Sequence, residues 1–148
     1  MAELVDARDS KSRGGDTVSV RVRPSAPFLD LGYLEIRMNS TDCLFCKIIQ
    51  KDIPAKFIYE DDNVIVIEDI NPKAPIHYLL IPKKHIVDFL HIEDGDERFI
   101  LAMSKAVKKI AKDLSGSKAF NIISNNGTKA GQSVLHLHWH FLSGKNIY

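Results

Sequence analysis

The segment His136-Leu137-His138-Trp139-His140-Phe141-Leu142 alternates strictly between histidine and large apolar residues. Because successive side chains of a β-strand point to opposite faces, this pattern predicts a strand with three imidazoles on one face and an apolar opposite face. Imidazoles two residues apart would lie about 7 Å from each other along such a strand. A single histidine is usually just hydrogen-bonded in the core or at the surface. Three histidines in this register favour a catalytic or metal-binding role instead.

Two kinds of chemistry fit three histidines on one strand. Alternating imidazoles could chelate a catalytic zinc ion that keeps an open coordination position. Alternatively, a neutral imidazole at about pH 7 can attack phosphorus, while a neighbouring protonated histidine neutralises phosphate or protonates the departing group. The upstream run Gly131-Gln132-Ser133 favours phosphate, because glycine lets the backbone approach a ligand closely and the serine hydroxyl can bond phosphate oxygens.

The first half of the domain reads as a short helix followed by strands. Residues 43–50 predict one or two helical turns that end before Pro54. Three further segments are rich in Ile, Val, Phe and Tyr and are separated by turn residues, which predicts antiparallel strands. These segments are residues 56–60, 63–69 and 77–82.

The second half predicts one long helix and two more strands. Asp94 and Glu97 have the spacing of a capping box, and Gly116 is placed to end the helix. Strands are expected at residues 118–124 and 134–142, on either side of a loop. The buried stripe of the helix is expected to comprise Ile100, Met103, Val107, Ile110 and Leu114. The sum is an α+β fold with about five antiparallel strands, one long helix and a short N-terminal helix.

The leader differs from the rest of the chain. Residues 1–38 carry mixed charge, scattered Gly, Ser and Pro and no sustained period, which predicts disorder or loose attachment. The runs 2–7 and 19–27 resemble a bacterial transfer-RNA gene translated as if it were coding. We hypothesise a misassigned start, with Met38 as the native initiator and the domain at residues 39–148. Residues 1–37 found on the cellular protein by N-terminal sequencing would contradict this.

Composition excludes several classes of function. The chain has 148 residues and is 45% hydrophobic, which is enough to bury a core. Its formal charge is only +1, so no global electric field attracts nucleic acid or an anionic membrane. No apolar run approaches the roughly 18 residues that span a bilayer, and no signal peptide is evident, so we expect a cytoplasmic protein. In that compartment the C-x-x-C pair Cys43 and Cys46 favours metal binding or redox chemistry. A thioredoxin-like role is disfavoured, because no βαβ-type strand precedes the pair.

Residues 125–140 read N-x-G-x-x-x-G-Q-S-V-x-H-x-H-x-H, which resembles the active-site signature of the histidine triad (HIT) family. Residues 69–77 and 81–85 resemble its nucleotide-binding half. The similarity runs from residue 42 to about residue 145 and is nearest to the Hint branch. It implies a HIT-like fold and hydrolysis of purine nucleoside phosphoramidates or related conjugates of AMP or GMP.

The resemblance also implies a role for each residue of the motif. His136 opens the triad, His138 would become covalently nucleotidylated, and His140 would contact the phosphate and leaving group. Ser133 would help to hold these groups, and His77 would support the catalytic strand through a hydrogen-bond relay. The implied nucleotide-binding set is Asp69 at the ribose, Ile70, Phe45 and Ile48 at the base, and Asn125, Gln132, Ser133, Val134, His138 and His140 at the ribose or phosphate.

Family members with C-x-x-C at this position bind structural zinc, which implies the ligands Cys43, Cys46, His85 and His136. Such a site has no open position, so the metal would staple the N-terminal turn to the sheet. The alternative is two reduced, partly buried cysteines without metal. No organic cofactor is expected.

The resemblance implies a homodimer that uses the long helix and one strand edge. The family usually continues past the triad with an aromatic and proline-containing tail, whereas this chain ends with residues 143–148, so the preference among leaving groups is open. Two other functions remain alternatives: a nucleotide-binding regulatory or scaffold module with little turnover, and a metal-centred hydrolase that uses the three histidines.

Overall fold

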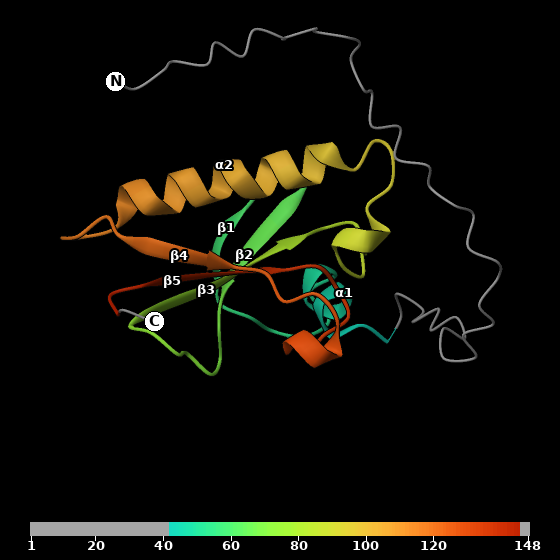
Figure 1. Cartoon of the computed structure of the whole chain (residues 1–148), viewed down its shortest axis with the longest axis horizontal. Helices are drawn as coiled ribbons and strands as arrows, with labels where there is room; N and C mark the ends of the chain where they lie inside the picture. Colours follow the sequence, from blue (N-terminus) through green and yellow to red (C-terminus); the bar gives the residue numbers. More distant parts are fainter. Residues whose placement is uncertain (1–41, 146–148) are drawn as a thin grey trace, which may run out of the picture. The chain divides into compact units, whose positions relative to one another are not determined.

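The computed structural model describes residues 42–145, which form a five-stranded antiparallel sheet with helices on both faces (Figure 1). The predictions for residues 1–38, including Met38 as initiator, lie outside the described residues, as do residues 146–148. The predicted α+β fold, with five antiparallel strands, one long helix and a short N-terminal helix, is confirmed.

The sheet has the strand order β1-β2-β3-β5-β4, with every neighbouring pair antiparallel. In chain order the elements are α1 (Leu44–Ile49), β1 (Phe57–Glu60), β2 (Val64–Glu68), β3 (Ile76–Pro82), η1 (Phe89–His91), α2 (Glu97–Asp113), β4 (Phe120–Ile123), η2 (Thr128–Ala130) and β5 (Trp139–Ser143). Within residues 42–145, no helix combines the length and the apolar character that a bilayer crossing requires.

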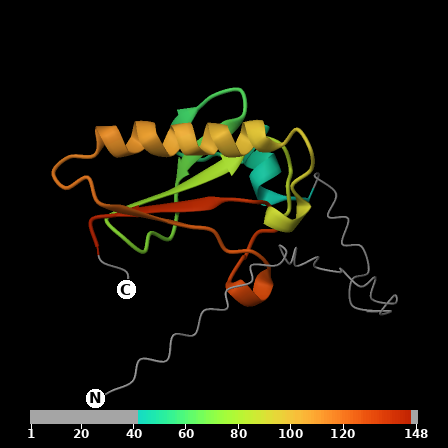
Figure 2. The same ribbon diagram turned by 45° about the horizontal axis from the view of Figure 1, so that its top comes forward.

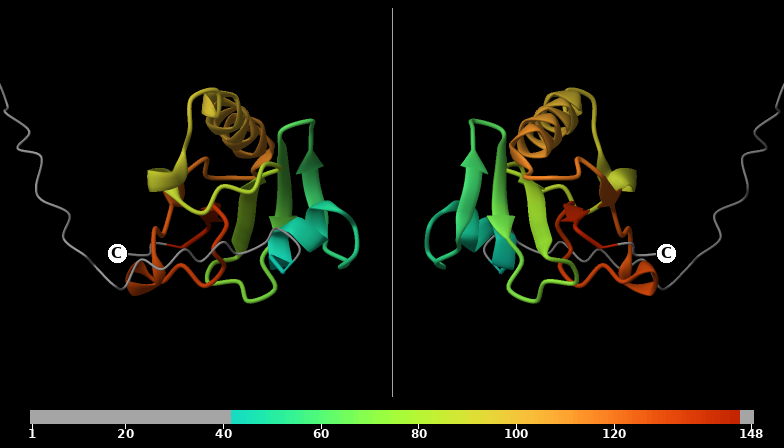
Figure 3. Two further views of the ribbon diagram at one scale, coloured as in Figure 1. Left: turned by 90° about the vertical axis from the view of Figure 1, so that its right-hand side faces the viewer. Right: turned by 90° about the vertical axis from the view of Figure 1, so that its left-hand side faces the viewer.

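The sheet is buried on both faces by alternating side chains. Val64 and Val66 of β2 pack under α2, whereas Ile65 and Ile67 pack with α1 on the other face. Figure 3 shows α2 on one side of the sheet and α1 with η2 on the other. Because both faces are covered, β2 and β3 are almost continuously apolar, as fully buried strands require.

Of the stripe predicted for α2, Met103, Ile110 and the following Leu114 are buried, and Ile100 and Val107 are half-buried against the same core. The helix begins differently from the prediction. The predicted capping box of Asp94 and Glu97 is wrong, because Asp94 lies in a turn and Asp96 precedes the helix. The Asp96 carboxylate accepts hydrogen bonds from Lys84 Nζ at 2.8 Å and from the backbone N–H of Glu93 at 3.1 Å. The start of α2 is therefore fixed by an ion pair to Lys84, which follows β3, and local spacing does not reveal this partner.

Strand β5 is shorter than predicted, since it begins at Trp139 rather than at residue 134. The preceding backbone bonds elsewhere: His136 N–H donates to the carbonyl of Val134, and Leu137 N–H donates to that of Ile86. The predicted alternation nevertheless extends beyond the strand. Leu137 and Phe141 pack in apolar clusters that include α2 residues, while the imidazoles lie on the opposite face.

Candidate active site

The three histidines form a row on the sheet face opposite α2. The ring centroids of His138 and His140 are 5.0 Å apart, and Phe45 of α1 packs edge-on against His138 at 5.1 Å and His136 at 5.9 Å. Figure 2 shows α2 above the sheet and η2 projecting from the opposite side, near the start of β5. Helix α1 and the loops on this face therefore frame the histidines.

His138 is held as a neutral imidazole with an unprotonated Nε2. Its Nδ1–H donates a hydrogen bond to the carbonyl oxygen of His136 at 2.7 Å. With the proton on Nδ1, the neutral ring carries its lone pair on Nε2. The ring is 3% exposed, and burial lowers its pKa below the ordinary histidine value. The backbone thus presents the form of histidine that can act as a nucleophile.

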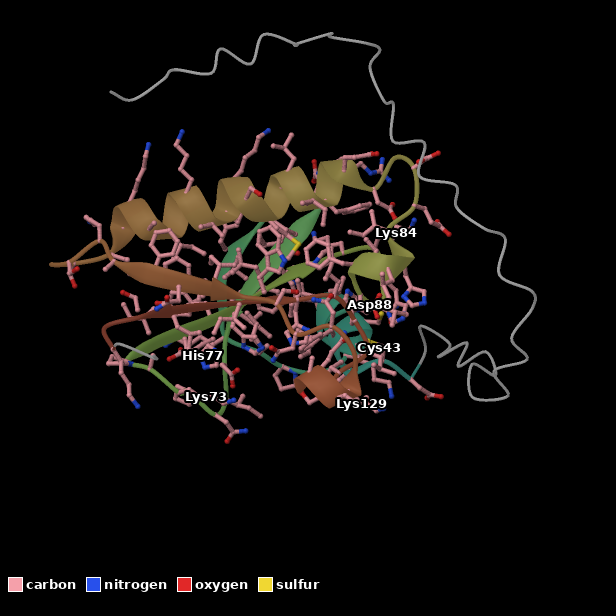
Figure 4. All side chains as sticks on the ribbon, in the orientation of Figure 1. Cys43, Lys73, His77, Lys84, Asp88 and Lys129 are labelled. Carbon is pink, nitrogen blue, oxygen red and sulfur yellow. The ribbon has the colours of Figure 1, made fainter. Side chains whose placement is uncertain are left out.

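His140 has the opposite tautomer. The backbone N–H of Lys73 donates to His77 Nδ1 at 3.1 Å, which places the proton of neutral His77 on Nε2. This Nε2–H donates to His140 Nδ1 at 2.9 Å, so His140 carries its own proton on Nε2. Figure 4 shows that Lys73 and His77 come from the loop before β3 and from the start of that strand. His140 is therefore oriented as a hydrogen-bond donor.

Burial keeps this row of imidazoles neutral. It lowers the pKa of His140 to about 4, helped by the neighbouring His138 and His77 and opposed by the Asp69 carboxylate. The pKa of His77 is also lowered, because the effect of burial exceeds the opposing effect of the Asp69 charge. A neutral row is consistent with one ring acting as nucleophile and the next as donor.

Asp69, His77 and His140 place ligand atoms within 4.8 Å of one another, which by distance alone would suit a metal ion. The Asp69 Oδ2 atom lies 3.4 Å from His77 Nε2. A metal on that Nε2 would require the proton on His77 Nδ1, because metal-ligating histidines donate their other N–H. The Lys73 N–H already donates to Nδ1, so this trio is a hydrogen-bond relay rather than a metal site.

Four other side chains converge as a candidate metal centre, with all ligand atoms within 4.8 Å of one another: Cys43, Cys46, His85 and His136. Cys43 Sγ lies 3.4 Å from His136 Nδ1, Cys46 Sγ lies 3.3 Å from His85 Nδ1, and the two Nδ1 atoms are 3.3 Å apart. A tetrahedral zinc ion with ordinary bond lengths places two nitrogens about 3.3 Å apart and a sulfur and a nitrogen about 3.5 Å apart. The donor set fits zinc.

The surroundings of the four ligands also fit a cation. His136 Nε2–H donates to the carbonyl oxygen of Pro82 at 2.9 Å, which directs the Nδ1 lone pair at the cysteines. Burial lowers the pKa of His136 to about 4, and burial beside Cys43 raises the pKa of Cys46 to about 12. A divalent ion would favour the thiolates that burial disfavours. Because His136 Nδ1 faces this centre, a metal bound by all three triad histidines does not fit.

The loop before β5 offers donors for an anion. The backbone N–H groups of residues 133–135 donate no hydrogen bond to any group within residues 42–145. Ser133 is exposed, Val134 is half-buried, and Asn125 Nδ2 is the nearest atom that a side chain added at Gly131 would meet. Gln132, by contrast, is 2% exposed and both ends of its amide bond the backbone, so its predicted contact with nucleotide stays a prediction.

The residues predicted to hold the base differ in burial, and their contact with a base stays a prediction. Phe45 is 5% exposed and contacts His138, and Ile48 lies in the apolar cluster between α1 and β2. Ile70 is 91% exposed on the loop after β2, so in this structure it covers nothing. The nearby Asp69 is fixed at that loop by the N–H of Asn71, which donates to its Oδ1 at 2.8 Å.

Sequence reasoning missed the groups that fix the imidazoles, because most of them are backbone atoms. The carbonyls of Pro82 and His136 and the amide of Lys73 decide which nitrogen of each ring carries the proton. Any residue supplies such atoms, so no sequence signal identifies them. The same holds for the Val87 carbonyl that binds Gln132.

Known proteins resemble this chain over nearly all of the described residues. A family model described as HIT domain matches residues 50–147. A HIT-like protein from Synechocystis is 40% identical over 104 residues, covering 70% of this chain and 91% of that protein. A HIT family hydrolase from Clostridium thermocellum has 44% identity and a TM-score of 0.68, covering 72% of this chain and 94% of its own. A zinc-bound histidine triad family protein from Mycobacterium smegmatis has 37% identity and a TM-score of 0.63, covering 73% and 78%.

The free energy of unfolding is expected to fall as the pH is lowered from about 6.5 towards about 4. In this window an unfolded histidine binds a proton that folded His140 resists, so acid favours the unfolded chain. Urea unfolding at several pH values measures the effect. His140→Gln should flatten the pH dependence, because it removes the ring whose pKa burial lowers. Equal curves for wild type and His140→Gln would contradict the account.

Proposed function

The chain belongs to the HIT domain family, and on that premise we propose that it hydrolyses purine nucleoside 5′-phosphoramidates or related nucleotide conjugates at the α-phosphate. The observation that carries the proposal is the pair of opposite tautomers on adjacent histidines. His138 offers a lone pair on Nε2, and His140 offers a proton on Nε2. Nucleophilic displacement at phosphorus needs both functions side by side.

In the first displacement, His138 Nε2 attacks the α-phosphorus and the bond from phosphorus to the departing nitrogen breaks. The departing amine takes a proton, for which His140 Nε2–H and the Ser133 hydroxyl are the available donors. The nucleotidylated imidazole keeps its Nδ1–H and gains positive charge. The carbonyl of His136, which already accepts that N–H, stabilises this charge.

In the second displacement, water attacks the same phosphorus, the bond from phosphorus to His138 Nε2 breaks, and the proton that the water loses returns to the group that protonated the amine in the first step. The nucleoside monophosphate leaves, and His138 returns to its neutral form. In both steps negative charge develops on the equatorial oxygens. We assign its stabilisation to the N–H groups of residues 133–135, which donate to no group within residues 42–145. The Asp69 carboxylate can accept hydrogen bonds from the ribose hydroxyls. Facing the phosphate instead, this carboxylate would be repelled, because both groups are negatively charged.

His138→Ala should abolish turnover of an adenosine 5′-phosphoramidate with a fluorescent amine, lowering kcat by at least about 10⁴-fold. The variant removes the only atom that bonds phosphorus, so the covalent intermediate cannot form. Mass spectrometry of quenched wild-type protein should show one nucleotidyl group on the peptide that contains His138.

The matched control is His91→Ala, at a histidine on η1 that bonds Asp88 and lies outside the row. It should leave turnover unchanged. Wild-type protein that binds AMP but releases no amine and forms no adduct would favour the binding-module alternative instead. Activity retained by His138→Ala would remove the nucleophile assignment.

We further propose that the centre of Cys43, Cys46, His85 and His136 holds structural zinc. The interatomic distances and the closed set of two sulfurs and two nitrogens support this, and the zinc-bound relative from Mycobacterium smegmatis is consistent with it. Zinc bound there would join α1 to the segments before β5 and after β3. Reduced cysteines held as metal ligands suit the cytoplasm, where we propose the protein acts.

Metal analysis of the purified protein should find one zinc ion per chain. His85→Gln should lose most of the zinc and lower the melting temperature, because binding free energy at a structural site contributes to folding. The same substitution at His91, which bonds Asp88 instead of the cysteines, should change neither quantity. Full zinc content in His85→Gln would contradict the ligand set.

We also propose a homodimer formed by α2 and the free edge of β4. A groove between them supports this, and Phe120 and Ile122 on β4 are 38% and 37% exposed. An unpaired apolar edge strand is a ready partner for another chain. Light scattering should report a dimer for wild type and a monomer for Ile122→Glu. Ile58→Glu on β1, the other edge, is matched in exposure at 37% and should stay dimeric; monomers in both would contradict the assignment.

A further inference from the structure

We propose that Gln132 is a positioning residue that clamps the loop 127–131 onto the 86–89 segment and so sets the geometry of the phosphate site. The inference deepens the proposed function and rests on it. It gives Gln132 a different role from the nucleotide contact that the sequence motif predicts, because its side chain is buried and fully engaged with the backbone.

The amide of Gln132 joins two segments that are far apart in the sequence. Its Nε2 donates to the carbonyl oxygen of Val87 at 2.7 Å, and its Oε1 accepts from the N–H of Gly127 at 2.7 Å. The backbone N–H of Gln132 also donates to the carbonyl of Gly127 at 3.2 Å. Gly127 is thus bonded at both its N–H and its C=O by one residue, which closes the loop on itself.

The 86–89 segment is itself bonded to the residues on either side of the clamp. Two further hydrogen bonds attach it to the same region: Leu137 N–H donates to the carbonyl of Ile86, and Phe89 N–H donates to Asn126 Oδ1 at 3.0 Å. Ile86 is 2% exposed and packs with Leu137 in an apolar cluster. The clamp therefore ties a glycine-rich loop to a segment that is anchored in the core.

The loop needs such an anchor because of its backbone conformation. Gly127 and Gly131 have φ angles of +84° and +88°, which L-residues with side chains rarely adopt, and residues 128–131 are exposed. Glycine leaves the loop conformationally free, so hydrogen bonds must fix its shape. The amides of residues 133–135, which we assign to the transition-state charge, follow the clamp directly in the chain.

The clamp should therefore act on the chemical step more than on nucleotide binding. Two of the predicted nucleoside contacts lie on other elements, at Asp69 after β2 and at Phe45 on α1, and neither residue is hydrogen-bonded to Gln132 within residues 42–145. A loop displaced by a fraction of an ångström would still leave these contacts in place. It would misalign the backbone donors, which matter most when charge develops on the phosphate.

The test compares Gln132→Glu with Gln50→Glu, the same substitution at the exposed glutamine that follows α1. Gln132→Glu keeps an acceptor for the Gly127 N–H but replaces the donor to Val87 by an oxygen that the carbonyl repels. We expect kcat for the adenosine phosphoramidate to fall by about 10²-fold, with the Kd for AMP changed by less than about threefold. Amide hydrogen exchange should accelerate across residues 127–131, and Gln50→Glu should match wild type in all three measurements.

Three results would overturn the proposal. An AMP affinity that falls in parallel with kcat would make Gln132 a nucleotide ligand. Unchanged exchange at residues 127–131 would show that the loop does not depend on it, and unchanged kcat would show that the loop's order is irrelevant to the reaction. If wild type itself has no turnover, the proposed function fails, but AMP affinity and amide exchange still decide whether the clamp exists.

A second variant covers the case in which Gln132→Glu does not fold. Asn126→Ala removes the neighbouring hydrogen bond to the Phe89 N–H from an exposed side chain, which limits its effect on stability. It should produce the same pattern at smaller amplitude: lower kcat, unchanged AMP affinity and faster exchange in the loop. A lower AMP affinity with unchanged exchange would count against a clamp between these two segments.

Discussion

The hydrogen bond from His138 Nδ1–H to the carbonyl oxygen of His136 is the constraint on which the site depends. It leaves Nε2 of His138 without a proton, and it can share the positive charge that the ring would gain on bonding to phosphorus. His136 also directs its own ring at Cys43, Cys46 and His85. One residue therefore links the candidate metal centre to the candidate nucleophile, through its side chain on one side and its peptide on the other.

Two clusters of histidine with other potential ligands lie on this face, and backbone partners give them different chemistry. At His136 a carbonyl accepts the proton on Nε2, which leaves Nδ1 as a metal ligand. At His77 an amide donates to Nδ1, which leaves Nε2 as a proton donor to His140. Residue type and distance alone would describe both as metal sites. The polarity of the backbone group behind each ring decides between ligation and proton relay.

Much of the site was predictable from the sequence, because alternation along a strand fixes which side chains share a face. Alternation predicted the row of imidazoles and the buried face of Phe141, and helical periodicity predicted the apolar stripe on α2. The family resemblance predicted that His85 joins the two cysteines. Such patterns fail where distant partners decide the local structure. The strand begins late because Leu137 N–H bonds the carbonyl of Ile86, and the helix begins at Glu97 because Lys84 holds the carboxylate of the preceding Asp96. The amide of Gln132 meets Val87 across 45 residues.

The central claim is that backbone contacts hold His138 and His140 in opposite neutral tautomers. Nitrogen-15 NMR of histidine-labelled protein at neutral pH, with correlations from each ring nitrogen to its carbon-bound protons, measures this directly. The account predicts a protonated Nδ1 and bare Nε2 for His138, and the reverse for His140. Two rings of the same tautomer, or a His138 imidazolium at neutral pH, would contradict it.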